Sequence, residues 1–172
     1  MSKEEFSIVI NFKGNSYTAE VSECNFLWTD LCSEVIKLDA LLCKDEDCAT
    51  ADLDIDFNDS DFSNLPDFIT EYVDGDPDRW DELFEVWYDS DFYLDLEVLE
   101  AGIELDIELK NIAEAYSGKY HSDAFFAEQL VKECYDLKSF EPSWLVIDWE
   151  ETAVNLMNDF TESNGYYFNN YY

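Results

Sequence analysis

The first part of the chain has a period-two pattern of apolar residues followed by a helical one. Apolar and polar residues alternate over Phe6–Phe12, turn-forming residues occupy Lys13–Ser16, and the alternation resumes over Tyr17–Val21. This pattern predicts a β-hairpin. Between Phe26 and Leu42, apolar residues then recur every three or four positions, which predicts an amphipathic helix. Its apolar positions are Leu27, Leu31, Val35, Leu38 and Leu42.

The segment Asp52–Phe57 alternates strictly between aspartate and apolar residues. A strand here would bury one face and line the other with Asp52, Asp54 and Asp56. Carboxylates on the same face of a strand are about 6.6–7 Å apart, close to the phosphate repeat along one DNA strand. The segment is therefore either a surface that imitates phosphates or an ordinary edge strand with a solvated acidic face.

Two helices are predicted in the middle of the chain. Leu65–Val73 fits a short helix ended by Asp74-Gly75, and Asp76-Pro77 is a helix start from which an apolar stripe continues through Tyr88. Acidic residues three or four positions apart lie away from that stripe, which predicts a row of carboxylates on the second helix. They are Asp78, Asp81, Glu82, Glu85 and Asp89.

The segment Phe92–Leu109 is ambiguous, because its apolar residues alternate as in strands while many of its residues favour helices. We favour helices over Phe92–Glu100 and Ile107–Tyr116, with Gly118 as a helix stop. Alternating carboxylates between these helices form a third candidate acidic surface: Glu104, Asp106 and Glu108.

The C-terminal part predicts two more helices and a strand. The helices span Asp123–Tyr135 and Asp148–Phe160, and the strand contains Tyr166–Phe168. Helices and short strands that follow one another in this way predict an α+β fold with small sheets and packed helices.

The charge of the chain is its most unusual property. It contains 42 Asp and Glu against 9 Lys and Arg, a formal net charge of −33, yet 17% of its residues are aromatic. Because acidic disordered chains lack aromatic residues, this chain is expected to fold. Duplex DNA carries one charge per ~1.7 Å, so 33 charges correspond to ~56 Å, or roughly 16 base pairs. The charge argues against binding to nucleic acid or an anionic membrane and favours a basic partner, although a halophilic or merely soluble surface is an alternative.

The sequence contains few residues for catalysis or for cofactor binding. The single histidine, His121, stands beside Ser122 and Asp123 in a predicted loop, and adjacency alone does not form a catalytic triad. The five cysteines lack CxxC spacing, and no apolar stretch reaches the length of a membrane span. Because Met1–Glu5 does not resemble a signal peptide, we expect reduced cysteines and a cytoplasmic protein. We predict no enzymatic activity and no cofactor.

One acidic segment has the spacing of a calcium-binding loop. Its carboxylates fall at positions one, three, five, nine and twelve: Asp74, Asp76, Asp78, Glu82 and Glu85. However, Arg79 stands where the loop needs glycine, and Pro77 favours the start of a helix. We therefore predict a helix and no metal site.

The second half of the chain resembles the ArdA antirestriction proteins. The resemblance lies in the segment Ala113–Tyr120, which contains a Tyr-x-Gly-x-Tyr turn, and in Ala127–Leu130, with the pattern Ala-Glu-x-Leu. It extends to Pro142–Trp149 and to the aromatic pair Tyr167-Phe168, and covers about residues 92–168. The resemblance implies an elongated, modular α+β protein from a phage or mobile element that mimics bent DNA and inhibits type I restriction–modification enzymes.

Charge and resemblance together predict the function and the domain organisation. We expect a hairpin, helix and strand module at residues 1–60 and an ArdA-like acidic region at residues 61–172. The protein is predicted to occupy the basic DNA-binding channel of a defence enzyme, a type I restriction–modification complex in the first place, in the cytoplasm of the host cell. An anti-CRISPR mimic against a Cas effector, or against another defence nuclease, is an alternative, as is a non-mimic inhibitor of a basic protein. A homodimer is left open.

Overall fold

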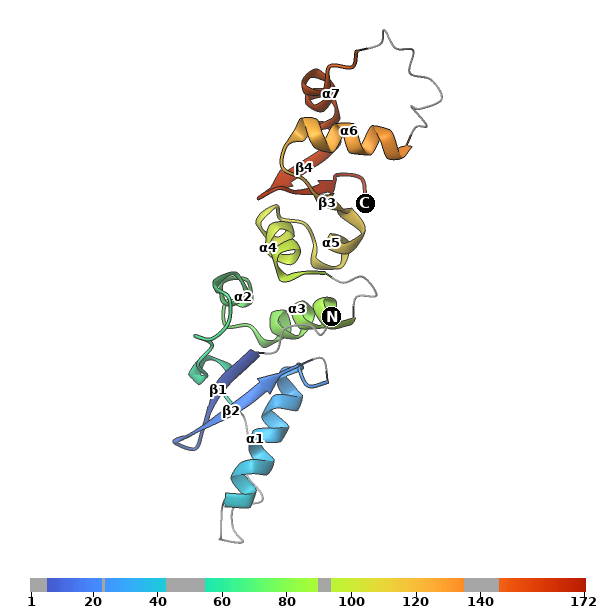
Figure 1. Ribbon diagram of the computed structural model, residues 1–172. Helices are drawn as coiled ribbons and strands as arrows, with labels where there is room; N and C mark the ends of the chain where they lie inside the picture. The colour runs from blue at the N-terminus through green and yellow to red at the C-terminus, as the bar shows by residue number, and fades with distance from the viewer. Residues whose placement is uncertain (1–5, 23, 43–54, 90–93, 135–145) are drawn as a thin grey trace. The chain divides into compact units, whose positions relative to one another are not determined.

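The computed structural model describes residues 6–22, 24–42, 55–89, 94–134 and 146–172 (Figure 1). The chain forms two compact units, Met1–Asp91 and Phe92–Tyr172. This division falls after residue 91, whereas the sequence analysis placed a boundary at residue 60. The segment after residue 60 belongs to the first unit because Val9 and Asp61 form two backbone hydrogen bonds, with N–O distances of 3.0 and 2.7 Å.

The first unit begins with the predicted hairpin, which is confirmed. Strands β1 (Phe6–Phe12) and β2 (Asn15–Val21) pair antiparallel. Lys13 and Gly14 connect them with positive φ angles of 50° and 77°, the backbone conformation of a two-residue type I′ turn. Glycine adopts this conformation at no steric cost, and its twist matches that of the strands.

Helix α1 (Trp28–Leu42) confirms the amphipathic helix predicted after the hairpin (Figure 1). Leu31 and Val35 are fully buried, as the spacing of the apolar residues requires. Asp39, on the same helix, is also buried, and its carboxylate accepts hydrogen bonds from Lys13 and Tyr17 of the hairpin. Helix and hairpin are thus held together by apolar packing and by one buried polar group.

The strand predicted over Asp52–Phe57 is wrong at its C-terminal end. Residues 52–54 lie outside the described residues. Ile55 and Phe57 are buried and Asp56 is exposed, which fits the alternation, but the chain forms a short 3₁₀ helix, η2 (Phe57–Asp59). The Asp56 carboxylate accepts a hydrogen bond from the backbone N–H of Asn58 at 3.0 Å. This side-chain cap stabilises a turn in place of a strand.

Helices α2 (Asp67–Val73) and α3 (Pro77–Asp89) confirm the two helices predicted next. The C-cap of α2 is Asp74 in the left-handed conformation, and the Asp76 carboxylate caps α3 by accepting from the Asp78 N–H at 2.9 Å. The apolar stripe of α3 is buried: Trp80, Leu83, Phe84, Trp87 and Tyr88. Its aromatic rings are the centre of the core of the first unit, where the Trp80 and Phe84 centroids are 4.4 Å apart.

The second unit begins with two helices whose limits differ from the prediction. Helix α4 (Leu96–Glu104) starts after Asp95 and continues past Glu100, and helix α5 (Leu109–Ala115) is shorter than expected. The two helices approach closely at Gly102, where an added Cβ would lie 2.8 Å from the Ile112 side chain. The role predicted for Gly118 is wrong, because it lies in strand β3 (Tyr116–Lys119) at φ +125°, next to a register shift.

A three-stranded antiparallel sheet of order β3-β5-β4 is the centre of the second unit. Strands β4 (Phe160–Ser163) and β5 (Tyr166–Asn169) form a hairpin, and β5 confirms the predicted final strand. The predicted helices are present as α6 (Asp123–Cys134) and α7 (Trp149–Leu156), but Phe160 begins β4 and does not extend the helix. The sheet lies between two pairs of helices, with α4 and α5 on one side and α6 and α7 on the other (Figure 1).

The fold class is therefore α+β, with two small antiparallel sheets and packed helices, as predicted. The elongation implied by the family resemblance stays a prediction. Among the described helices, none has the length and apolar character needed to cross a membrane.

Candidate acidic interaction surface

The outer face of α3 carries the clearest row of carboxylates. Asp78, Glu82 and Glu85 are all exposed and stand four and three positions apart, so they share one face of the helix. With a rise of about 1.5 Å per residue, successive carboxylates are spaced about 6 and about 4.5 Å along the axis. We call these three residues the α3 row. Asp89, the last residue of α3, has a side chain outside the described ones.

Asp81 does not belong to this row, although the spacing of the sequence placed it there. Its side chain is half-buried, and its carboxylate accepts a hydrogen bond from the backbone N–H of Trp28 at 2.7 Å. This N–H belongs to the first residue of α1 and has no acceptor within its own helix. Burial raises the pKa of Asp81, and the nearby carboxylates of Asp78, Asp30 and Glu85 raise it further, against the hydrogen bond from Trp28. Asp81 is therefore engaged by the start of α1 and is not presented to a partner with the α3 row.

The acidic strand face predicted at Asp52, Asp54 and Asp56 is described at only one of its three residues. Asp52 and Asp54 lie outside the described residues. Asp56 is exposed, but its carboxylate caps η2. An alternating acidic strand face is therefore not described at this position.

The third candidate surface surrounds the turn between α4 and α5. All three of its carboxylates are exposed, but Glu104 ends α4, Asp106 lies in the turn at φ +56°, and Glu108 is the N-cap residue of α5. Glu104 accepts hydrogen bonds from Ser163 Oγ at 2.6 Å and Asn164 Nδ2 at 3.1 Å. Glu108 pairs with Lys110 at 2.9 Å. Two of the three carboxylates thus have partners within the second unit.

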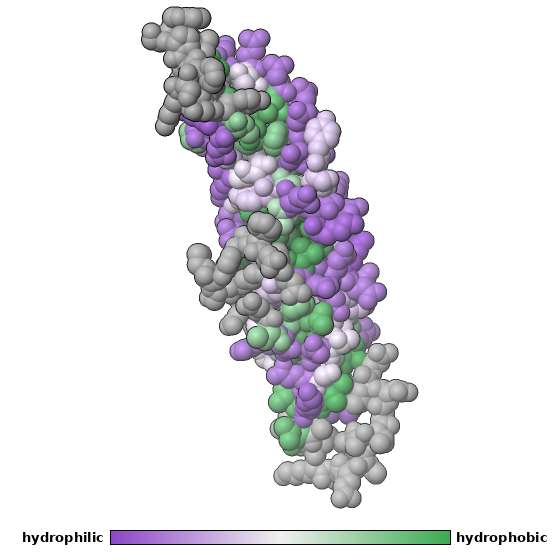
Figure 2. Space-filling view, turned by 90° about the vertical axis from the view of Figure 1, so that its right-hand side faces the viewer, coloured by the Kyte–Doolittle hydropathy of each residue, from purple (hydrophilic) through white to green (hydrophobic). Residues whose placement is uncertain are grey.

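Many exposed carboxylates were not singled out from the sequence. Most lie in first turns of helices, in loops and at caps, and Glu71 and Glu114 lie within the short helices α2 and α5, where no long periodic pattern marks them. In the first unit they include Asp30, Asp59, Asp61, Asp67, Glu71 and Asp74, and in the second Asp95, Glu114, Asp148, Glu150, Glu151 and Asp159. The acidic surface is therefore broader than the predicted rows, and hydrophilic residues cover most of the described face in Figure 2.

Most of the described cations have a carboxylate partner. Lys13, Lys110, Lys119 and Lys132 each form an ion pair with a carboxylate at 3.1 Å or less. Arg79 donates to the backbone oxygen of Tyr72. Because 42 acidic residues face only 9 basic ones, these pairs leave most carboxylates without a counter-charge from the chain. The surface potential is accordingly negative.

Two carboxylates are each held by one tyrosine and one lysine, which the sequence analysis did not foresee. Asp39 binds Tyr17 and Lys13 in the first unit. Glu97 accepts from Tyr166 and Lys119 in the second. In each case the tyrosine hydrogen bond is the main cause that lowers the carboxyl pKa, followed by the hydrogen bond from lysine. Each partner lies 22 or more positions from its carboxylate in the chain, so no local spacing signals these contacts.

His121, Ser122 and Asp123 do not form a catalytic triad. The His121 ring is exposed and lies 4.3 Å from the Phe125 ring, centroid to centroid. The Ser122 hydroxyl oxygen accepts from the Phe125 backbone N–H at 3.2 Å, and the Asp123 carboxylate accepts from the Tyr167 hydroxyl at 2.6 Å. Within the described parts of the chain, no group of three or more His, Cys, Asp or Glu residues could hold a metal ion. The segment with calcium-loop spacing is helical from Pro77 onward, as predicted.

Comparisons of the chain with protein-family models, with curated proteins and with solved structures gave no match. The resemblance to the ArdA proteins stays a prediction. The exposed carboxylates and their charge consequently carry the functional argument alone.

Proposed function

We propose that this protein inhibits a DNA-handling defence enzyme by occupying its basic DNA-binding channel. Its carboxylates take the positions of phosphates and bind the arginines and lysines that would otherwise hold DNA. The first target we propose is a type I restriction–modification complex in the host cytoplasm, and a Cas effector offers the same kind of channel. The observation that carries the proposal is the large excess of exposed carboxylates over cations on a folded, aromatic-rich chain.

The α3 row supports this proposal in structural terms. Asp78, Glu82 and Glu85 lie on a helix whose opposite face is fixed in the aromatic core, so their backbone positions are rigid. Rigid carboxylates bind a cationic channel without the entropic cost of ordering a mobile segment. Their spacing of about 4.5–6 Å along the helix axis compares with about 3.4 Å per phosphate along the axis of one DNA strand, so the row presents negative charge in a line at a somewhat lower density than DNA does.

The test is a competition experiment. The purified protein should displace labelled duplex DNA from a type I restriction–modification enzyme and should itself bind no DNA. Because the binding is electrostatic, its affinity should fall steeply as salt rises. The same assay with a Cas effector distinguishes the two targets.

Variants of the α3 row sharpen this test. The triple variant Asp78→Asn/Glu82→Gln/Glu85→Gln should weaken competition by about tenfold or more, whereas Glu82→Gln alone should change it by less than about threefold. The charge-conserving variant Asp78→Glu/Glu82→Asp/Glu85→Asp is the matched control and should retain most of the activity. Abolition of competition by Glu82→Gln alone would favour a conventional interface, and failure to displace DNA from any nuclease would refute mimicry.

A further inference from the structure

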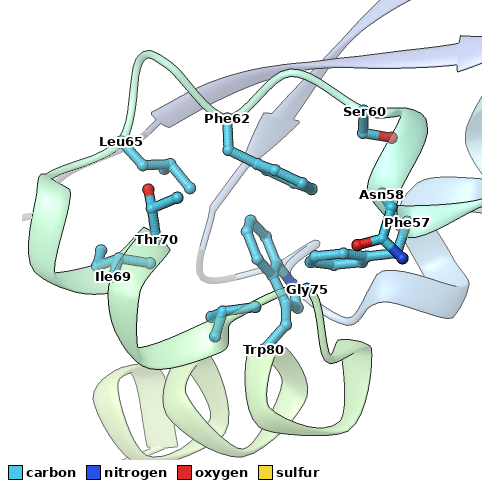
Figure 3. A pocket seen from close by; sticks show the side chains of 10 residues that line it. Phe57, Asn58, Ser60, Phe62, Leu65, Ile69, Thr70, Gly75 and Trp80 are labelled. Carbon is cyan, nitrogen blue, oxygen red and sulfur yellow. The ribbon is translucent and has the colours of Figure 1, made fainter.

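The first unit contains an aromatic cavity that the proposed function does not use (Figure 3). Its volume is about 170 Å³, and η2, the loop that follows it, α2 and the start of α3 form its walls. Leu65 and Ile69 line it on the α2 side, and Phe57, Phe62 and Trp80 face them (Figure 3). An apolar cavity of about 150 Å³ in another protein holds one benzene molecule. This cavity therefore has the size for one six-membered ring.

The aromatic walls are fixed by contacts with one another and with the backbone of Phe26. The Phe57 and Phe62 rings stack with centroids 4.6 Å apart, and the Phe62 and Trp80 centroids are 5.5 Å apart. The indole N–H of Trp80 donates to the backbone oxygen of Phe26 at 2.8 Å, so it is not free to bind a ligand. The walls consequently offer ring faces and edges, which suit an aromatic guest.

The rim of the cavity is polar and closely packed. Gly75 lies at φ +74°, and a Cβ added there would come within 2.5 Å of Asn58 Oδ1. A side chain at position 75 would thus displace Asn58 at the rim. Ser60 lines the cavity, and its hydroxyl oxygen is buried and has no hydrogen-bond partner among the described residues. A buried hydroxyl without a partner is costly, so a ligand that reached this oxygen would satisfy it.

A wider acidic depression adjoins the cavity. It has a volume of about 540 Å³ and shares Ser60, Phe62, Leu65 and Thr70 with the cavity. The depression adds three exposed carboxylates, those of Asp61, Asp67 and Glu71, and none of the described residues that line it is cationic. The hydrogen bonds from Ser63 lower the pKa of Asp61, so this group stays charged at neutral pH. An apolar cavity thus opens beside negative charge, with the Ser60 hydroxyl at the junction.

We propose that this composite site binds a small organic cation that carries one aromatic ring next to an ammonium group. The ring enters the cavity between Leu65 and Ile69 on one side and the Phe62 and Trp80 rings on the other, and the ammonium lies in the depression, where the carboxylates attract it and Ser60 Oγ accepts one of its N–H groups. This inference does not rest on the proposed inhibition of a defence enzyme.

Phenethylamine is the probe for this site, and backbone amide NMR of the full chain is the measurement. Titration at low millimolar concentrations should shift the amides of residues 57–75 and Trp80 saturably. Phenylacetate has the same ring with the opposite charge, and ethylamine has the charge without the ring. Each should bind at least about tenfold more weakly than phenethylamine, because phenylacetate lacks the positive charge and ethylamine lacks the ring.

Two variants test the named groups. Ser60→Ala should weaken phenethylamine binding about threefold to tenfold without loss of folding, since it removes an unpaired hydroxyl. Asp67→Asn/Glu71→Gln should weaken it by a similar factor. The matched control is Glu150→Gln/Glu151→Gln, which removes the same charge from the first turn of α7 in the other unit and should leave the affinity unchanged.

Three outcomes would overturn the proposal. The first is equal binding of phenylacetate or ethylamine, which would show that ring or charge is irrelevant. The second is a set of shifts spread over the acidic surfaces of both units, which would indicate unspecific cation binding. The third is an unchanged affinity for phenethylamine in both variants, Ser60→Ala and Asp67→Asn/Glu71→Gln. None of these results bears on competition with DNA, so the two proposals fail separately.

Discussion

Each of the two units holds one carboxylate with a tyrosine and a lysine, but the two carboxylates differ in their environment. In the first unit, Asp39 accepts from Tyr17 Oη at 2.6 Å and from Lys13 Nζ at 3.1 Å. In the second, Glu97 accepts from the Tyr166 hydroxyl and from Lys119 Nζ at 3.1 Å. The Asp39 side chain is 6% exposed, whereas the Glu97 side chain is 69% exposed.

The difference in exposure decides how much each group of three stabilises its unit. Water competes for the Glu97 carboxylate and screens its attraction to Lys119, so an exposed ion pair contributes little. Asp39 exchanged water for its two partners when helix α1 packed on the hairpin. Loss of either partner would leave a buried carboxylate unsatisfied. In a chain with a net charge of −33, the value of a carboxylate for stability therefore depends on its burial.

The largest expected effect is that of Asp39→Asn. The amide keeps the shape of the side chain but loses the charge that binds Lys13 and the strong acceptor that Tyr17 uses. We expect the Tm of the first unit to fall by about 5 °C or more. Tryptophan fluorescence is a suitable measurement, because Trp28, Trp80 and Trp87 are buried in this unit. An unchanged Tm would show that the buried carboxylate is neutral for stability.

Acid pH should destabilise the first unit through Asp39 more than the second unit through Glu97, because Asp39 is buried and Glu97 is exposed. Both carboxyl pKa values are lowered from ordinary values of 3.8 for Asp39 and 4.5 for Glu97. Each therefore contributes stability that is present above its ordinary pKa and lost as the pH falls through the lowered value. Urea unfolding below about pH 4 should show this loss in the first unit, and Asp39→Asn should make its acid limb shallower. An identical limb in the variant would contradict the assignment.

The pKa shift of Asp81, in the same unit, has the opposite sign to that of Asp39. Asp81→Asn should therefore be mildly stabilising at neutral pH. Its pKa is raised above 3.8, so its contribution is present below that value and is lost as the pH rises through the folded-state pKa. Asparagine still offers an oxygen to the Trp28 N–H but no charge to repel Asp78 or Glu85. We expect a Tm increase of about 1–3 °C at pH 7 and none at pH 3. A decrease at pH 7 would mean that the charged hydrogen bond outweighs the repulsion.

Sequence patterns predicted the elements whose signals are local. The hairpin, α1, α2, α3 and α6 followed from periodicity and caps, because one face of each must be buried. Strand β4 was missed although Asn164-Gly165, both at positive φ, is a strong hairpin signal between β4 and β5. Gly118 was misread because a glycine in a bulge and a glycine at a helix end look alike in sequence.

The candidate site was less predictable than the fold. Helical spacing identified the α3 row, but it could not show that Asp81 turns toward the start of α1, 53 positions earlier in the chain. The tyrosine partners of Asp39 and Glu97 are likewise brought together only by tertiary packing. Long-range polar contacts of this kind leave no periodic signal.

The smallest expected effect is that of Glu97→Gln, the exposed counterpart of Asp39→Asn. The glutamine carbonyl can still accept from Tyr166, and the lost attraction to Lys119 is one that water already screens. Both variants remove one negative charge, so the relief of overall repulsion is the same and cancels in the comparison. We expect a Tm change of no more than about 2 °C in the second unit, measured from its amide NMR signals during heating. A loss as large as that of Asp39→Asn would show that the tyrosine–lysine arrangement, and not burial, sets the contribution of each carboxylate.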